Sequence, residues 1–159
     1  MATEQQYAVF KALYDEEAAR YRDLSDRAKT YISVITIFSG VLVFKSDDLQ
    51  KFLNGGLLAR WSFVAGAVLF ICALGALLAA TRIRGYVRFA DPDVIIDKWP
   101  KKALGDEEFF TDRIGELAIS TNANATCNND LANWLAVSSW LLIAAVAAMM
   151  LSLIGRVVK

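Results

Sequence analysis

Three apolar stretches without a charged residue alternate with charged parts along the 159-residue chain. The second and third stretches, residues 61–81 and 131–155, contain 21 and 25 residues. Because a helix rises about 1.5 Å per residue, each could cross the roughly 30 Å hydrocarbon core of a bilayer. Each stretch therefore predicts a transmembrane helix.

The first apolar stretch, residues 30–44, is shorter. Its 15 residues give about 22 Å of helix, which falls short of the hydrocarbon thickness. Lys29 and Lys45 flank the stretch, and their long stems can lie along apolar surface while the ammonium groups reach the headgroups. A buried core helix is the alternative, but the sequence offers no soluble domain to surround it. We therefore expect a short span that pairs with residues 61–81 as a hairpin.

The distribution of basic residues predicts an orientation. Twelve Lys and Arg residues lie before the first span or between the second and third, and five lie on the other side. The positive-inside rule then places the N-terminus in the cytosol and the C-terminus outside, as in a multi-pass inner-membrane protein. The predicted parts are a cytosolic amphipathic helix (1–29), a transmembrane hairpin (30–81), a cytosolic segment (82–130), a third span (131–155) and a short tail (156–159).

Two amphipathic stripes predict helices outside the membrane. The first follows heptad spacing with Glu17 as its one polar interruption, and no proline or glycine precedes Gly40, so one long helix should run into the first span. Its members are Tyr7, Phe10, Tyr14, Tyr21, Leu24, Ala28 and Tyr31. Pro92 and Pro100 should break the middle segment into an irregular or strand-like piece before helix resumes near Asp106. The second stripe consists of Phe110, Ile114, Leu117 and Ala118.

We therefore expect an all-α membrane protein with three transmembrane helices. Its long N-terminal helix and the helix before the third span should pair as a cytosolic helical stalk. The partner of the N-terminal stripe is either this middle segment or a second copy of the chain.

Asparagine is concentrated just before the third span, and one set of polar residues there shares a helical face. The set comprises Asn122, Thr126, Asn129 and Asn133. One interpretation is hydrogen bonding between helices at the membrane edge. The other is a polar stripe that lines a ligand pocket or the vestibule of an oligomer.

Basic residues gather at the inner membrane edge and form a candidate site for a compact anionic ligand. They are Arg27, Lys29, Arg82, Arg84 and Arg88. The alternative is orientation and contact with phospholipid headgroups. The predicted cytosolic parts contain 12 basic and 15 acidic residues, a net charge of −3, which argues against a nucleic-acid surface.

Inside the three spans there is no charged residue and no histidine, which argues against a proton relay, voltage sensor or ion-coupled transporter. Small residues at four-residue spacing should allow close helix packing, within one chain or between copies of a homo-oligomer. They are Ser62 and Gly66; Cys72, Ala76 and Ala80; and Ala144, Ala148 and Ser152. No nucleophile, metal-ligand or phosphate-binding arrangement is apparent, so we expect no enzyme activity, metal or cofactor.

Two motifs resemble the Pycsar effector family of bacterial antiphage systems, and more loosely the SLATT proteins. The stretch "LSDRAKTYISV" (residues 24–34) is similar to an Asp, basic, Ala motif at the membrane edge. The stretch "ISTNANATCNNDLANWLAVSSWLL" is similar to the polar helix that enters the last span, although Asp130 and Asn133 stand where a basic residue is usual.

The resemblance implies a dormant inner-membrane protein that oligomerises when a partner enzyme makes a cyclic nucleotide and then breaches the membrane of the infected cell. Two other function classes fit the sequence. The chain could be a membrane anchor or scaffold that recruits a soluble partner, or a small ungated, holin-like pore.

Overall fold

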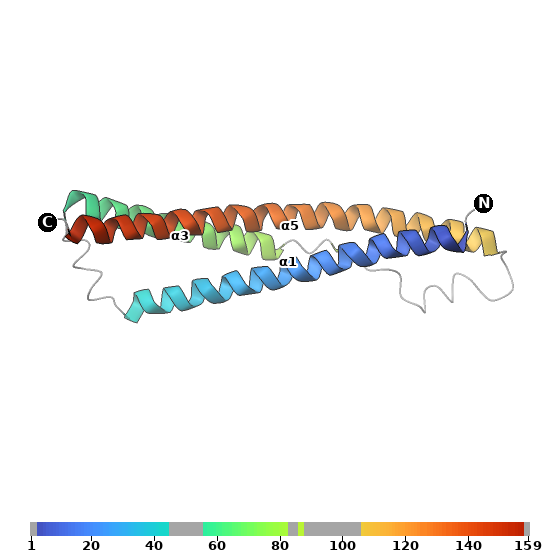
Figure 1. Ribbon diagram of the computed structural model, residues 1–159, viewed down its shortest axis with the longest axis horizontal. Helices are drawn as coiled ribbons and strands as arrows, with labels where there is room; N and C mark the ends of the chain where they lie inside the picture. The colour runs from blue at the N-terminus through green and yellow to red at the C-terminus, as the bar shows by residue number, and fades with distance from the viewer. Residues whose placement is uncertain (1–2, 45–55, 83–85, 88–105, 158–159) are drawn as a thin grey trace. The chain divides into compact units, whose positions relative to one another are not determined.

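The computed structural model describes residues 3–44, 56–82, 86–87 and 106–157. The described residues form three helices and no strand: α1 (Glu4–Phe44), α3 (Leu57–Arg82) and α5 (Asp106–Val157) (Figure 1). The predicted all-helical class is therefore confirmed. The predicted break around Pro92 and Pro100, and most of the loop of the predicted hairpin, lie outside the described residues.

Helix α1 is one continuous helix of 41 residues, as the stripe and the lack of proline predict. Its N-terminus has a capping box: the Gln6 N–H donates to the Thr3 hydroxyl (3.3 Å), and the Thr3 N–H donates to Gln6 Oε1 (3.1 Å). Helix α5 begins at Asp106, where helix was predicted to resume, and its acidic first turn, Asp106 to Glu108, complements the helix dipole.

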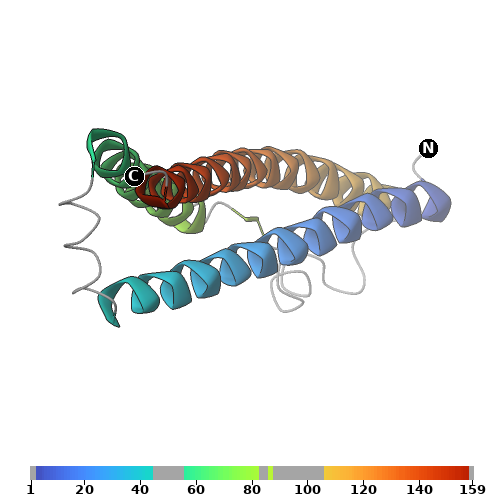
Figure 2. The ribbon, with the colours of Figure 1, turned by 60° about the vertical axis from the view of Figure 1, so that its left-hand side comes forward.

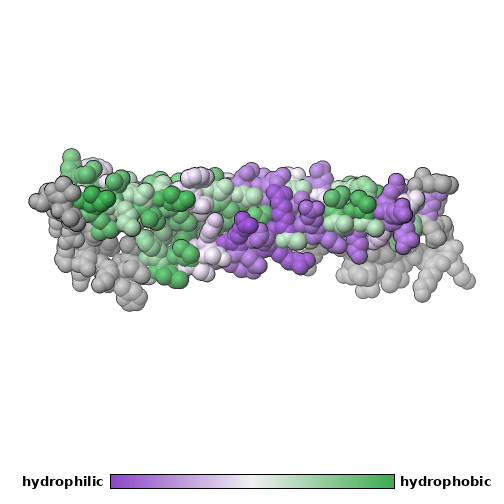
Figure 3. All heavy atoms as spheres, viewed as in Figure 1, coloured by the Kyte–Doolittle hydropathy of each residue, from purple (hydrophilic) through white to green (hydrophobic). Residues whose placement is uncertain are grey.

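The chain forms two compact units, and α1 and α5 contribute to both. Residues 1–24 and 84–130 make one, which we call the polar unit; residues 25–83 and 131–159 make the other, the apolar unit. On the face shown in Figure 3, hydrophobic residues gather over the apolar unit, whereas hydrophilic residues cover much of the polar unit.

In the apolar unit, α3 and α5 lie side by side in both ribbon views (Figures 1 and 2). Each presents a buried residue at every seventh position. On α3 these are Ala59, Gly66, Ala73 and Ala80, and on α5 they are Leu131, Ser138, Ala145 and Ser152. The Ser152 hydroxyl donates to the Ala59 carbonyl (2.7 Å), and the Ser138 hydroxyl donates to the Ala73 carbonyl (3.0 Å). The two helices are thus antiparallel and in heptad register.

The small size of these residues lets the two backbones approach closely. A Cβ atom placed on Gly66 would lie 2.8 Å from Met149 Cγ and 3.1 Å from the Ala145 carbonyl oxygen. Between helices in lipid there is no hydrophobic driving force, so close packing and hydrogen bonds of about 0.6 kcal/mol each must hold them together. The serine hydroxyls supply such bonds at two levels of the pair.

The part of α1 in the apolar unit packs through one face. Ile35 is buried, and the Phe38 ring contacts the Phe70 ring of α3 with 5.6 Å between centroids. Val34 and Ile37 are more than half exposed. Within residues 30–40, α1 therefore contributes one contact stripe and leaves much apolar surface uncovered.

Among the described residues, two helices are long and apolar enough to cross a membrane, α3 and residues 107–155 of α5. Only 28% and 17% of their most apolar windows are buried. A core helix of a soluble protein would be mostly buried, so these two helices present the apolar surface that a lipid-facing helix needs. The crossing by residues 30–44 stays a prediction.

The predicted small-residue faces divide into buried and exposed members. Gly66, Ala76, Ala80 and Ser152 are buried within the chain, whereas Cys72 and Ala144 are exposed. Ser62 and Ala148 are half-buried. The buried seam follows a seven-residue repeat rather than the four-residue spacing alone, and packing of these residues between copies stays a prediction.

We predict that Gly66→Ala destabilises the chain relative to Gly75→Ala. Both variants gain the same helix propensity, but an added Cβ meets the Ala145 backbone at Gly66 and nothing within 4 Å at Gly75. Overpacking should cost about 1–3 kcal/mol, seen as a lower thermal midpoint in detergent. Equal midpoints for the two variants would contradict the close approach of α3 and α5.

Candidate functional site

The N-terminal stripe of α1 packs on α5 of the same chain in the polar unit. The Tyr7 ring contacts the Phe110 ring with 5.8 Å between centroids. Tyr7, Phe10, Tyr14 and Tyr21 are half-buried, and Leu24 is buried. The structure therefore gives the stripe an intramolecular partner.

Asn124 of α5 is fully buried and binds the backbone of a residue outside the helices. Its Oδ1 accepts a hydrogen bond from the Val87 N–H (2.7 Å), and its Nδ2 donates to the Val87 carbonyl (3.0 Å). The Tyr14 hydroxyl donates to the same carbonyl (3.2 Å). The side-chain amide thus pairs with Val87 as a neighbouring β-strand would.

The residue before Val87 adds an aromatic contact. The Tyr86 ring packs against Tyr21 (4.7 Å between centroids) and Tyr14 (6.5 Å), both on α1. Burial raises the pKa of Tyr86 to about 12, and the neighbouring Tyr14 adds to the shift, while the positive charge of Arg22 acts in the opposite direction. We call Tyr86 and Val87 the 86–87 strap, because they tie the chain beyond α3 to both α1 and α5.

A second polar contact explains why Glu17 interrupts the apolar stripe. Asn128 is fully buried, and its Nδ2 donates to the Glu17 carbonyl oxygen (2.9 Å) and to Glu17 Oε2 (2.6 Å). Arg20 forms an ion pair with Glu17 Oε1 (3.6 Å) and donates to Asn129 Oδ1 (2.8 Å). Glu17 is therefore held by groups from both helices.

The predicted polar stripe is exposed in the structure. Asn122, Thr126, Asn129 and Asn133 are all exposed on α5. Thr126 donates to the Asn122 carbonyl of its own helix, and Asn129 accepts the hydrogen bond from Arg20 of α1. The buried amides are Asn124 and Asn128, which the stripe did not include. A heptad count between Leu117 and Leu131 would have placed Asn124 in the buried seam. A role for the exposed stripe in contacts between copies stays a prediction.

The predicted basic cluster is described only in part. Arg27, Lys29 and Arg82 are exposed, and Arg84 and Arg88 lie outside the described residues. Lys29 Nζ donates to Asp26 Oδ1 (2.8 Å), and this hydrogen bond and charge raise the pKa of Lys29. An anion at this edge would have to compete with Asp26 for Lys29.

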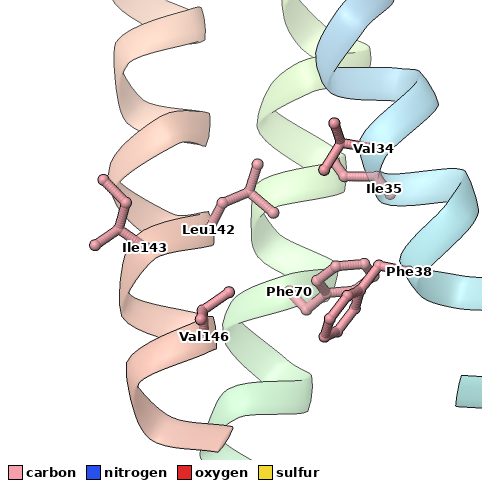
Figure 4. Close-up of a pocket in the computed structure, with 7 residues that line it drawn as sticks. All are labelled: Val34, Ile35, Phe38, Phe70, Leu142, Ile143 and Val146. Carbon is pink, nitrogen blue, oxygen red and sulfur yellow. The ribbon is translucent and has the colours of Figure 1, made fainter. Parts of the chain in front are cut away.

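The apolar unit contains a pocket of about 290 Å³ whose lining side chains are all apolar (Figure 4). It is lined by Val34, Ile35 and Phe38 of α1, Phe70 of α3, and Leu142, Ile143 and Val146 of α5. In Figure 4, Phe38 and Phe70 lie against each other on one side, and Ile143 and Val146 lie on the other. A pocket of this kind has no group that could orient a polar ligand.

A smaller pocket, about 150 Å³, lies between α1 and α5 in the polar unit. Its walls combine aromatic, aliphatic and charged side chains: Tyr7, Lys11, Tyr14, Asp15 and Leu117. Tyr14 is shared between this pocket and the contact with Val87. Tyr14 therefore takes part in both features of the polar unit.

The fold and these contacts define a class of helical protein with two helices able to span a membrane and a polar unit built on the extensions of α1 and α5. Comparison with known protein families, curated proteins and solved structures gives no match for this chain. In the described part of the chain, no group of three or more His, Cys, Asp or Glu residues could hold a metal ion.

We predict that Asn128→Ala lowers the stability of the chain by about 1–3 kcal/mol, because it leaves the mostly shielded Glu17 carboxylate without its amide donor. Asn122→Ala is the matched control: Asn122 lies on the exposed side of the same helix, so its replacement should change stability by about 0.5 kcal/mol or less. The measurement is the unfolding midpoint in detergent. An Asn128→Ala variant as stable as Asn122→Ala would show that the Glu17 contact is not formed.

Proposed function

We propose that the chain is an integral inner-membrane effector of antiphage defence. It oligomerises and permeabilises the membrane in response to a cytosolic signal, a cyclic nucleotide. The supporting observation is that α1 and α5 each continue without a break from the polar unit into the apolar unit. A change in how the two helices pack in the polar unit could therefore reach the membrane part through these continuous helices.

The proposed topology has three spans, with the N-terminus and residues 82–130 in the cytosol and the C-terminus outside. The exposed apolar surface of α3 and α5 supports two of these spans, and the distribution of Lys and Arg supports the orientation. Residues 30–44 would form the first span. Because this span is short, the bilayer must thin around it, and the cost of that mismatch favours a rearrangement that relieves it.

Oligomerisation is supported by the polar groups that the chain leaves exposed. Asn122, Thr126, Asn129 and Asn133 occupy one exposed face of α5 near the start of its apolar part. Amides and hydroxyls at such a depth form hydrogen bonds between helices. A second copy could meet Asn122, Thr126 and Asn133 without disturbing the buried seam of α5, whereas Asn129 already accepts a hydrogen bond from Arg20.

We predict that expression of the chain alone leaves cells impermeable to a DNA-binding dye. Expression together with a nucleotide cyclase should make the cells take up the dye, because the signal would then rearrange the membrane helices. Dye fluorescence in single cells measures the result, and cells that express the cyclase alone are the control.

Two results would contradict the proposal. The first is that cells stay impermeable to the dye with every cyclase tested, although each cyclase is shown to raise its cyclic nucleotide in those cells. This result would favour a membrane anchor that recruits a soluble partner. Dye uptake without any cyclase would favour an ungated, holin-like pore.

A further inference from the structure

The buried seam of α5 contains an asparagine where its neighbours in the repeat are leucine. Leu117 and Leu131, seven residues before and after Asn124, fill the same seam with apolar side chains. Burying an amide in place of leucine is unfavourable unless both its donor and its acceptor are hydrogen-bonded. Among the described residues, Asn124 meets this condition through Val87, which belongs to neither helix. The residue therefore serves recognition of Val87 and not the pairing of α1 with α5.

The 86–87 strap presents two features to the helices. One is a flat aromatic ring, which lies against Tyr21, and the other is an adjacent N–H and C=O, which pair with Asn124. Proteins recognise a nucleobase by the same two features, since aromatic side chains stack on its face and an asparagine amide pairs with a neighbouring donor and acceptor on its edge. The strap thus occupies a site whose lining side chains, Tyr14, Tyr21 and Asn124, suit a nucleobase.

The side chains that line this site are held more firmly by the fold than the strap is. Tyr14, Tyr21 and Asn124 lie within long helices, and Asn124 is fully buried. Val87 is 41% exposed and is held through its backbone. Removing the strap would leave the Asn124 amide unsatisfied, so a ligand that supplies a donor and an acceptor is favoured as its replacement.

The surroundings also suit the charged part of a nucleotide. Arg22 is exposed and directly follows Tyr21 on α1, and its charge lowers the pKa of Tyr86. A guanidinium is a good partner for a phosphate. A ligand with its base on Asn124 and Tyr21 could therefore place a phosphate near Arg22.

We propose that the 86–87 strap is a built-in substitute for a nucleobase, and that a cyclic mononucleotide binds between α1 and α5 by displacing it. This inference rests on the proposed function, because it identifies the site that would receive the cytosolic signal. The strap follows the last residue of α3, Arg82, by only a few residues. Displacement of the strap would break its contacts with Asn124 and Tyr21 close in sequence to the end of α3, a proposed membrane helix.

The test uses the full-length chain in lipid nanodiscs and the four 3′,5′-cyclic mononucleotides of adenine, cytosine, guanine and uracil as probes. Titration calorimetry measures binding, and hydrogen exchange measures protection of the Val87 amide. We expect one of the probes to bind and to speed exchange of the Val87 amide about tenfold, because the hydrogen bond to Asn124 is lost. The amides of residues 127–129 in α5 should keep their exchange rates.

Two variants should change binding in opposite directions. Val87→Pro removes the N–H that donates to Asn124 Oδ1 and leaves the side chains of Tyr14, Tyr21 and Asn124 in place. The same probe should therefore bind about five to tenfold tighter. Asn124→Leu restores the apolar repeat and removes the amide, so binding should fall more than about tenfold while the thermal midpoint is kept or raised. Thr111→Leu, at an exposed position of α5 to which no binding role is assigned, should bind as the unmodified chain does.

Several results would overturn the inference. They are undiminished binding by Asn124→Leu, no gain in Val87→Pro, binding that leaves Val87 exchange unchanged, or no binding of any probe to Val87→Pro. Dye uptake in cells separates this inference from the proposed function. If Asn124→Leu still permeabilises cells only when a cyclase is present, the function stands and this site falls.

Discussion

The close approach of α3 and α5 through residues with almost no side chain is the constraint on which the rest of the structure depends. Lipid offers no hydrophobic reward for bringing two apolar helices together, so the pair must be held by packing and hydrogen bonds. Glycine and alanine provide the packing at Gly66 and Ala73, and the hydroxyls of Ser138 and Ser152 provide the bonds. Because the contact uses one narrow seam, much of the apolar surface of both helices remains exposed.

The same seven-residue repeat runs along α5 through both units. Every seventh residue from Leu117 to Ser152 is buried, and the repeat changes to small side chains after Leu131, the first α5 residue of the apolar unit. This change matches the proposed environments of the two units, because burial of large side chains stabilises helix pairs in water and close approach stabilises them in lipid. Asn124 occupies a position of this repeat but is polar where its neighbours in the repeat are leucine, and its amide binds Val87.

Much of the fold could be predicted from periodicity. The absence of proline and the heptad stripe gave the length of α1, and Asp106 was identified as the start of α5. The polar contacts could not be predicted in the same way. Spacings of three and four residues show that Asn122 and Asn129 share a face, but they do not show whether that face is covered. The contact of Asn124 with Val87 joins a side chain to a backbone 37 residues away, and backbone groups have no sequence signal.

Disulfide cross-linking in native membranes tests the antiparallel register of α3 and α5 most directly. With Cys72 and Cys127 replaced by alanine, Ala59→Cys and Ser152→Cys should join rapidly within one chain, since the Ser152 hydroxyl lies 2.7 Å from the Ala59 carbonyl oxygen. Ala59→Cys with Ala145→Cys, two turns of helix away, should join slowly. Equal rates for the two pairs, or products that link two chains in place of one, would contradict the account.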